Sequence, residues 1–291
     1  MKRVGIIPNF TKDKNLDLTK KIIQWIEQHD GEVLLQKIDA EKIHRKDLAY
    51  KADEIYAYAD FIIVLGGDGT LLGVSRRVGK NETPILGVNL GHLGFLTEVE
   101  IGDIYQALEN IMADHYALEK RMMLEVAVFN NNKLVKTFFA LNDVVITKGA
   151  FARIINLKTF IDNNYLDTYP ADGLIISSPT GSTAYSLSAG GPIVDPKNSL
   201  LIITPICPHR LNARSVIISD REKIRVEIED RKNDILLTID GQEGYKLQDE
   251  DDIVVKKAEF SANFIRVNHR TFYDVLRNKL AERTVLHKDN V

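Results

Sequence analysis

The first hundred residues alternate short apolar runs with helical patterns, and no other feature constrains the fold as strongly. Four runs are apolar enough to form buried strands: Val4 to Ile7, Val33 to Leu35, Phe61 to Leu65 and Ile85 to Val88. Buried strands that alternate with helices form parallel sheets with helices on both faces. We therefore expect residues 1–100 to form an α/β domain with a parallel sheet.

Three segments between or after these runs have helical spacing. Apolar side chains recur at helical intervals from Leu18 to Ile26, and Gly31 stands where a C-terminal cap is expected. Lys42 to Ala59 is predicted as a second helix. Thr70 to Val78 is predicted as a short third helix that begins directly after a strand.

The periodicity changes near residue 100. After one more helical segment, Ile104 to Met112, short strand-like runs follow one another: Met123–Phe129, Leu134–Phe139, Asn142–Thr147, Ile154–Ile161, Ile224–Ile228 and Ile235–Ile239. Turn-forming residues lie between them, at Asn130 to Asn132 and at Asp240-Gly241. This pattern predicts an antiparallel, all-β C-terminal domain over residues 101–265.

The C-terminal residues are helical again. Phe272, Val275, Leu276 and Leu280 fall on one face of this helix. We expect this C-terminal tail, residues 266–291, to pack back on the first domain and complete it.

Charge and composition exclude several classes of protein. With 38 basic and 41 acidic residues the net charge is −3, which is not typical of nucleic-acid binders or polybasic membrane binders. The single cysteine, Cys207, allows no intramolecular disulfide and no cysteine-based zinc site. No apolar run approaches the roughly 18 residues of a membrane span. The apolar run that follows Met1-Lys2-Arg3 and ends at Pro8 is too short for a signal peptide. We expect a cytoplasmic protein.

The clearest local feature follows the third buried strand. Phe61 to Leu65 leads directly into Gly66-Gly67-Asp68-Gly69-Thr70, at the sheet edge where α/β proteins bind their ligands. Glycines let the backbone approach a phosphate, and the helix that follows offers N–H donors to an anion. Asp68 is suited to act as a base for a hydroxyl or to hold a divalent cation. The structural alternative is a tight turn in which Asp68 caps the helix.

A second glycine cluster, Gly87 to Gly94, follows the next strand and is expected to line the same crevice. His92 within it is interpreted as a structural hydrogen-bonding residue. Neither common nucleotide motif is present: Gly73 to Lys80 has the wrong spacing for a P-loop, and Leu72 stands where the dinucleotide fingerprint requires a third glycine.

Hydroxyl-bearing and small residues fill the stretch from Asp172 to Pro192. Small side chains allow a flat ligand to lie against the backbone, and hydroxyls supply hydrogen bonds to a base or ribose. The stretch contains no G-x-S-x-G nucleophile motif, and the chain contains no H-E-x-x-H metal motif.

Together these motifs resemble the bacterial NAD kinases (ATP-NAD kinases). The resemblance spans nearly the whole chain and is carried, in order, by Gly66–Thr70, Leu141–Asp143, Asp172–Pro192, Thr204–His209 and Asp240–Glu243. The first motif also occurs in diacylglycerol kinases, sphingosine kinases and phosphofructokinases, whereas the long third motif is specific to NAD kinases. This chain has Gly73 and Val74 where many members have a basic side chain or histidine, so only backbone phosphate contacts are expected there.

The resemblance implies roles for particular residues. Asp68 would be the base toward the 2′-hydroxyl of the adenosine ribose, with Gly67 and Gly69 near the phosphates. Asn142 and Asp143 would bind the dinucleotide. The remaining expected binding residues are Arg153, Asp172, Thr183, Ala184, Tyr185, Ser186, Leu187, Ser188, Cys207 and Gln242. Of these, residues 183–188 would bind the adenine half of NAD, with Ser186 as a polar contact. The structural interpretation of Cys207 is different, because a cysteine without a disulfide partner is typically a small buried residue.

The resemblance also implies the reaction: transfer of the γ-phosphoryl of ATP to NAD, with a divalent cation (Mg²⁺ or Mn²⁺), by a homodimer or homotetramer. No nucleic acid or membrane is expected as a partner. Two alternatives remain open from the sequence. A lipid or sugar kinase could use the same glycine-aspartate motif, and a regulatory module could bind NAD without turnover. The preferred phosphoryl donor and the choice between NAD and NADH also stay open.

Overall fold

The structure is a computed structural model of the 291-residue chain and describes every residue except 92–93, 150–152, 230–233, 249, 269 and 286–291. Its internal contacts divide the chain into two compact units. The first comprises Met1–Lys120 with Ala262–Val291, and the second comprises Arg121–Ser261. Two strands, β7 (Ala117–Asn130) and β18 (Asp251–Arg266), belong in part to each unit.

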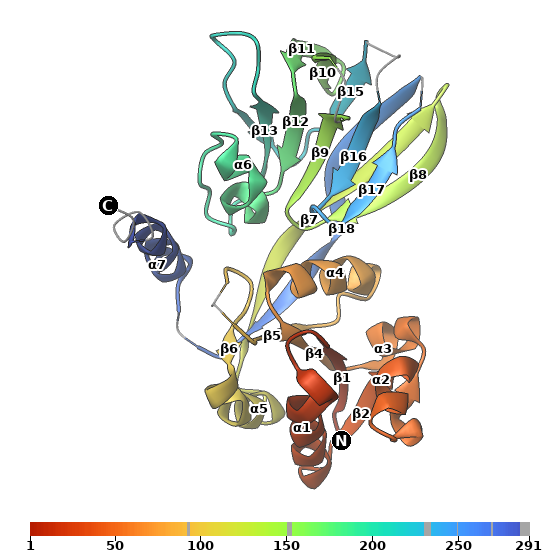
Figure 1. Cartoon of the computed structure of the whole chain (residues 1–291), viewed down its shortest axis with the longest axis vertical. Coiled ribbons are helices and arrows are strands. Elements are labelled where there is room, and N and C mark those ends of the chain that lie inside the picture. Colours follow the sequence, from red (N-terminus) through yellow and green to blue (C-terminus); the bar gives the residue numbers. More distant parts are fainter. Residues whose placement is uncertain (92–93, 150–152, 230–233, 249, 269, 286–291) are drawn as a thin grey trace. The chain divides into compact units, whose positions relative to one another are not determined.

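The first unit contains a parallel sheet in the order β5-β4-β1-β2-β3, with β6 and the end of β18 beside β5 (Figure 1). Its strands are β1 (Arg3–Pro8), β2 (Glu32–Gln36), β3 (Ala49–Tyr50), β4 (Phe61–Gly66), β5 (Ile85–Asn89) and β6 (Val99–Glu100). Val4 lies opposite Phe61, and Ile62 lies opposite Ile85. The predicted α/β domain with a parallel sheet is confirmed.

Helices cover both faces of this sheet. They are α1 (Asp17–Gln28), α2 (Lys37–Lys42), α3 (Ala52–Tyr58), α4 (Asp68–Val78) and α5 (Ile104–Met112), with short 3₁₀ turns at Lys14–Leu16, Lys46–Leu48, Gly79–Asn81 and Ile101–Asp103. Ile22 of α1 and Leu108 of α5 share one core cluster with Ile63. On the other face α3 packs so closely that a Cβ at Gly5 would lie 2.7 Å from Ile55, and α4 packs so closely that a Cβ at Gly87 would lie 2.7 Å from Leu71.

One local prediction for this unit is wrong. Residues 42–59 do not form one helix, because His44 has a left-handed φ of 58° and Ala49 pairs with β2 as a short strand. The predicted C-terminal cap of α1 is present, with Asp30 in the left-handed conformation before Gly31. Gly31 donates its N–H to the carbonyl of Ile26 at 2.9 Å, in the arrangement of a Schellman motif. Its missing side chain matters because a Cβ there would lie 2.4 Å from Ile26 Cγ2.

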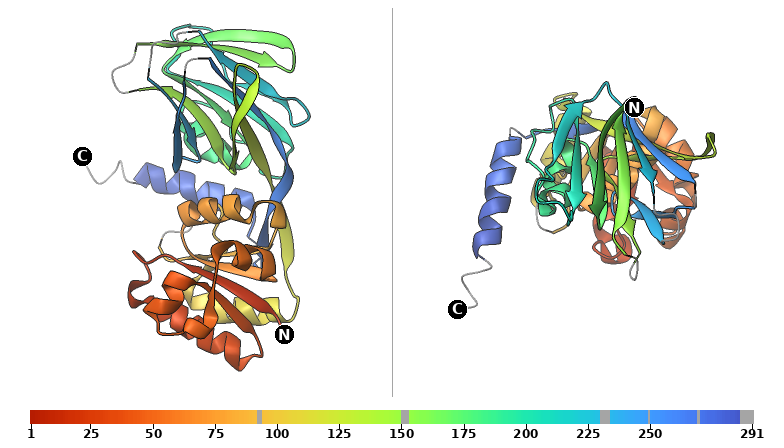
Figure 2. Two further views of the ribbon diagram at one scale, coloured as in Figure 1. Left: turned by 90° about the vertical axis from the view of Figure 1, so that its right-hand side faces the viewer. Right: turned by 90° about the horizontal axis from the view of Figure 1, so that it is seen from above.

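The second unit is a sandwich of two sheets. One has the order β11-β10-β15-β18, with β7 beside β18 and β8 beside β7; the other has the order β14-β13-β12-β9-β16-β17. The strands are β8 (Lys133–Ala140), β9 (Asp143–Lys148), β10 (Ile155–Ile161), β11 (Asn164–Ala171), β12 (Gly173–Ser177), β13 (Leu200–Ile206), β14 (Val216–Ser219), β15 (Ile224–Ile228), β16 (Ile235–Ile239) and β17 (Glu243–Lys246). Figure 2 shows the strands of this unit from two further sides.

Alternating residues of both sheets meet in the core of the second unit. Val126, Ile146, Leu174, Leu201 and Val226 are buried there in one apolar cluster, as expected for antiparallel sheets packed face to face. The pairings of β10 with β11 and of β12 with β9 and β13 are antiparallel. The predicted all-β C-terminal fold is confirmed.

Both predicted turns of this unit are present. Asn131 and Asn132 have φ values of 48° and 61°, as a two-residue hairpin turn requires, and asparagine tolerates this region well. Asp240 and Gly241 have φ values of 50° and 65° at the end of β16. The hydroxyl-rich stretch contains a 3₁₀ turn at Thr180–Thr183 and a single helical turn, α6 (Tyr185–Ser188).

The change of periodicity near residue 100 does not coincide with the division between the units. Helix α5 packs in the first unit's core through Leu108, so this unit extends to Lys120.

The predicted C-terminal helix is present as α7 (Phe272–Val285), and the Phe272 ring centroid lies 6.0 Å from that of Phe95. Leu280, expected on its apolar face, is 45% exposed. The packing of the tail on the first unit therefore stays a prediction. Among the described helices none is long and apolar enough to cross a membrane.

Candidate active site

The glycine-aspartate motif forms the connection between β4 and α4. Strand β4 ends at Gly66, Gly67 is extended, and α4 begins at Asp68. A Cβ at Gly66 would lie 2.4 Å from Thr70 Oγ1, so only glycine allows the chain to turn this tightly. The motif therefore brings backbone and one carboxylate to the carboxyl edge of the parallel sheet, where such sheets bind ligands.

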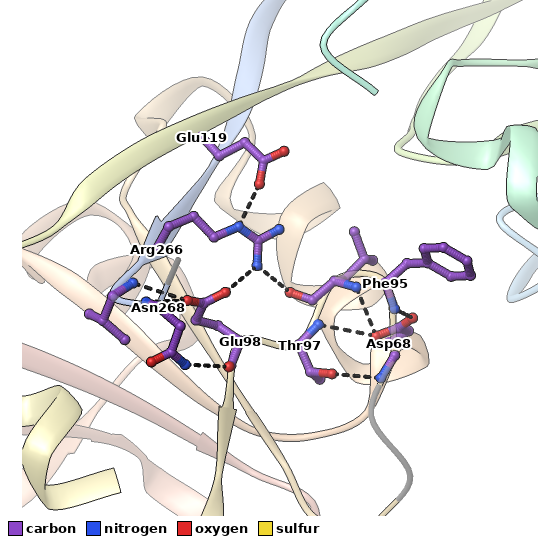
Figure 3. A network of polar contacts seen from close by, with 10 residues as sticks. Asp68, Phe95, Thr97, Glu98, Glu119, Arg266 and Asn268 are labelled. Atoms are coloured by element: carbon purple, nitrogen blue, oxygen red, sulfur yellow. Dashed lines mark hydrogen bonds and ion pairs between the residues drawn. The ribbon is translucent and has the colours of Figure 1, made fainter. Parts of the chain in front are cut away.

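The Asp68 carboxylate is held by backbone donors from another segment of the first unit. Its Oδ2 accepts the N–H of Phe95 at 2.8 Å, and its Oδ1 accepts the N–H groups of Leu96 and Thr97, each at 3.2 Å (Figure 3). It makes no side-chain cap of α4, so the structural alternative of a capping aspartate is wrong. Because Oδ2 accepts only one of these bonds, it retains a lone pair for a further donor.

The second glycine cluster lies against this carboxylate, as predicted. A Cβ at Gly94 would lie 2.0 Å from Asp68 Oδ1, which is closer than any real contact. The N–H of Gly94 donates to Thr97 Oγ1 at 2.9 Å and closes the turn that presents the three donors. His92, interpreted as a structural residue, lies outside the described residues.

Behind this turn lies a polar network with the end of β18. The Arg266 guanidinium donates to the Leu96 carbonyl at 3.3 Å, pairs with Glu98 at 2.9 Å and also contacts Glu119 (Figure 3). Glu98 is only 7% exposed and accepts the N–H of Asn268 at 2.7 Å. The loop that orients Asp68 is thus fixed by a buried ion pair from a distant part of the chain.

A separate pocket of about 430 Å³ lies in the second unit. Its walls come from β9, β16 and the start of α6, and its lining residues are Asn142, Asp143, Val145, Thr147, Ala184, Tyr185, Thr238, Asp240 and Gly241. The pocket brings together four residues of the predicted binding set, Asn142, Asp143, Ala184 and Tyr185. Its size is within the range typical of small-molecule sites.

Two carboxylates lie at this pocket. Asp240 accepts the backbone N–H groups of Leu141 at 3.1 Å, Asn142 at 2.8 Å and Asp143 at 3.2 Å. Burial, with a further contribution from the Asp240 charge, raises the pKa of Asp143 to about 7. From the sequence, Asp240 could be identified as a turn residue and as part of a family motif, but not as the residue that orients the predicted ligand residues.

The hydroxyl-rich stretch uses many of its hydroxyls internally. Ser178 Oγ donates to the Leu141 carbonyl at 2.5 Å, and Ser182 Oγ donates to the Val194 carbonyl at 3.1 Å. Ser186, predicted as a polar ligand contact, is fully buried and lies 3.1 Å from Thr204 Oγ1. These hydroxyls stabilise the conformation of the loop. Tyr185, in contrast, is 45% exposed and lines the pocket.

The other predicted binding residues of the second unit lie outside the pocket lining. Asp172 forms an ion pair with Lys148 at 2.7 Å, and Arg153 and Gln242 are exposed. Cys207 is exposed with a φ of 45°, so its interpretation as a small buried residue is wrong.

The described residues include no group of three or more His, Cys, Asp or Glu side chains placed to hold a metal ion.

Comparisons with known proteins agree with this architecture. Residues 4–116 match the family model of the ATP-NAD kinase N-terminal domain, and residues 141–267 match that of the ATP-NAD kinase C-terminal domain. An NAD kinase of Thermoanaerobacter sp. (strain X514) is 52% identical over 97% of this chain and 100% of its own length. An NAD kinase of Caldanaerobacter subterraneus subsp. tengcongensis is 51% identical over the same shares.

Solved structures of similar proteins include yeast NADH kinase in complex with NADH, with a TM-score of 0.85 and 25% identity over 97% of this chain and 88% of that one. An NAD kinase from Archaeoglobus fulgidus in complex with ATP gives a TM-score of 0.74 and 25% identity over 94% of this chain and 97% of that one. With both family models matched in order and relatives that align over nearly the whole length, the chain belongs to the ATP-NAD kinase family.

Proposed function

We propose that this enzyme transfers the γ-phosphoryl of ATP to the 2′-hydroxyl of the adenosine ribose of NAD and so produces NADP. Family membership supports the reaction, and the similar structures hold its two kinds of substrate, NADH in one and ATP in the other. The single observation that carries the assignment of the chemistry is the carboxylate of Asp68, which is oriented by three backbone donors and keeps one acceptor position.

Asp68 is the proposed general base. Its Oδ2 accepts the proton of the 2′-hydroxyl as that oxygen forms a bond to the γ-phosphorus, and the bond from this phosphorus to the β,γ-bridging oxygen breaks to release ADP. Phosphoryl transfer depends chiefly on positioning and on neutralising charge, so a fixed carboxylate is well suited to this step. The three N–H donors keep Asp68 in place.

The glycines on either side of Asp68 are the proposed phosphate contacts. Gly67 and Gly69 carry no side chain of their own that would keep a triphosphate from the backbone, and α4 begins here with its positive dipole end. In this proposal the contacts at these two glycines come from the backbone, which suits a chain with Gly73 and Val74 in the next turn.

The second unit would bind the dinucleotide. The pocket beside Asn142, Asp143 and Tyr185 can hold a nucleoside-sized group, with amide and carboxyl groups for its polar edges. We keep the rest of the expected set as proposed binding residues, namely Arg153, Asp172, Thr183, Ala184, Ser186, Leu187, Ser188, Cys207 and Gln242. For Ser186 the proposed role is indirect, through the shape of the loop.

A divalent cation, Mg²⁺ or Mn²⁺, is the proposed cofactor. Mg²⁺ commonly binds enzymes through one or two carboxylates together with substrate phosphates, and Asp68 beside the glycine loop fits such a site. When bound, the cation would neutralise charge on the phosphates of ATP.

We further propose a homodimer or homotetramer located in the cytoplasm, as the resemblance implies. Light scattering of the purified protein tests the assembly. A monomer at micromolar concentration would contradict this part of the proposal.

The reaction itself is tested by incubating the purified protein with ATP, Mg²⁺ and either NAD or NADH. An NADP-specific dehydrogenase reports the phosphorylated product, and phosphorus NMR locates the new phosphate. The proposal expects a 2′-phosphate on the adenosine ribose. Binding of NAD without product would instead indicate a module that has lost turnover, and phosphorylation of a lipid or sugar alone would indicate a different kinase.

A further inference from the structure

One lysine of the first unit lies over the glycine-aspartate motif. The ammonium of Lys12 is 3.3 Å from the position that a Cβ would occupy at Gly67, and 3.4 Å from the corresponding position at Gly91. Both glycines lack the side chain that would exclude it. Lys12 is therefore close to the backbone of both glycine clusters, although it lies more than fifty residues away from either in the sequence.

The loop that carries Lys12 is anchored to the motif. Asn9 follows β1, and its Nδ2 donates to Thr70 Oγ1 at 3.1 Å. The backbone N–H of Lys12 in turn donates to the carbonyl of Asn9 at 3.1 Å. Through these two bonds the position of Lys12 is tied to the same turn that presents Asp68.

The neighbours of Lys12 are committed to holding this loop. Asp13 is buried and accepts the N–H groups of Leu18 and Thr19, each at 3.0 Å, at the start of α1. The Phe10 ring lies under the Lys42 ammonium, 3.2 Å from it. These contacts fix the loop on both sides of Lys12 without using the Lys12 side chain.

The Lys12 ammonium has no partner in the part of the chain that the structure describes. Lys12 is exposed, and its side chain forms no hydrogen bond or ion pair with the residues that the structure describes. A positive charge that is held beside a glycine loop but left without an acidic partner is suited to an anionic ligand. The nearby carboxylate of Asp68 is instead engaged by backbone donors.

We propose that Lys12 is a further catalytic residue, which contacts the terminal phosphate of ATP and stabilises the negative charge on the phosphoryl group during transfer. The inference rests on the proposed function, because it takes the glycine-aspartate motif as the phosphate site. Lys12 exchanges no proton with the substrates. Its ammonium forms a charge-assisted hydrogen bond to a phosphoryl oxygen, while Asp68 takes the proton of the hydroxyl.

The test compares Lys12→Met and Lys12→Arg with Lys14→Met, a matched control at an exposed lysine two residues away. The methionine variants keep most of the apolar stem and remove the charge. For Lys12→Met we expect kcat to fall on the order of 10²-fold, the KM for ATP to rise, and the KM for NAD to stay unchanged. Lys12→Arg should retain more activity than Lys12→Met, and Lys14→Met should behave as the wild type.

The outcomes separate this inference from the proposed function. If the wild type forms NADP and Lys12→Met matches Lys14→Met, Lys12 has no catalytic role. A rise confined to the KM for NAD would also contradict the inference, because it would place Lys12 at the dinucleotide. If the wild type forms no NADP, the proposed function fails. Calorimetry with ATP then tests whether Lys12 contacts phosphate. Weaker ATP binding by Lys12→Met than by the wild type supports the contact, and equal binding excludes it.

Discussion

The Oδ1 atom of Asp68 and the α-carbon of Gly94 lie so close that no side chain fits between them, since a Cβ at Gly94 would be 2.0 Å from that oxygen. The three residues that follow Gly94, at positions 95–97, donate their N–H groups to the Asp68 carboxylate. The location of the proposed base is therefore set by packing against backbone.

The first prediction follows from this contact. Gly94→Ala should push the carboxylate from its donors and lower kcat on the order of 10²-fold, because small displacements of a catalytic group are costly. Gly102→Ala is the matched control, since a Cβ there meets nothing within 4 Å. Steady-state NADP formation by the two variants checks the prediction, and equal kcat values would show that Asp68 need not be held where it is.

The second prediction concerns Arg266 as a positioning residue. Arg266→Met leaves Glu98 buried without its cation, so the free energy of unfolding of the first unit should fall by about 3 kcal/mol. Loss of the bond to the Leu96 carbonyl should also lower kcat, with the KM values for ATP and NAD little changed. Chemical denaturation and steady-state kinetics measure the two effects.

The control for Arg266 is Arg277→Met. Arg277 pairs with Asp274 on α7 with a side chain that is 73% exposed. Exposed pairs contribute at most about 1 kcal/mol, so this variant should resemble the wild type. A purely structural role for Arg266 would reduce stability but leave the kcat of the folded enzyme intact.

The third prediction is a pH dependence at Asp143. Burial raises its pKa from 3.8 to about 7, so between these values the folded chain holds a proton that the unfolded chain has released. The contribution of this group to stability is present below pH 4 and is lost as the pH rises toward and through 7. Asp143→Asn should remove this dependence, and unfolding measured from pH 4 to pH 8 checks the slope. Identical slopes in both proteins would contradict the raised pKa.

The fourth prediction tests the role of Asp240 in the second unit. Asp240→Ala leaves the N–H groups of residues 141–143 without their acceptor, so the predicted ligand residues Asn142 and Asp143 should lose their orientation. We expect the KM for NAD to rise on the order of 10-fold. Asp234→Ala removes an exposed carboxylate, 73% exposed in its pair with Lys246, and should leave the KM unchanged. A normal KM in Asp240→Ala would show that the dinucleotide binds elsewhere.

Much of the fold could be predicted because the signals are local. Strands such as Phe61–Gly66 are continuous apolar runs, and the turn at Asn131-Asn132 has residues that tolerate positive φ. The segment 42–59 was mispredicted because its apolar spacing is weak and pairing of Ala49 with β2 prevailed over helix propensity. The structure of that segment is determined by its pairing with β2, a tertiary contact that cannot be read from local sequence.

The partners within the site could not be predicted in the same way. The donors to Asp68 are backbone groups of residues 95–97, and a backbone N–H leaves no trace in residue type. The position of Lys12 over Gly67 likewise depends on folding that joins segments far apart in the chain. Asp68 itself could be identified, since a carboxylate among glycines after a buried strand is a local pattern.

The most direct test of the account is the turnover of Asp68→Asn beside the wild type, with NAD and ATP binding measured by calorimetry on both. Because the amide also weakens the contacts to the turn at residues 95–97, thermal unfolding of the variant is recorded in parallel. The account predicts that the folded variant still binds both substrates but forms NADP on the order of 10²–10⁴ times more slowly. Near-normal turnover by a folded Asp68→Asn would contradict the assignment of Asp68 as the base.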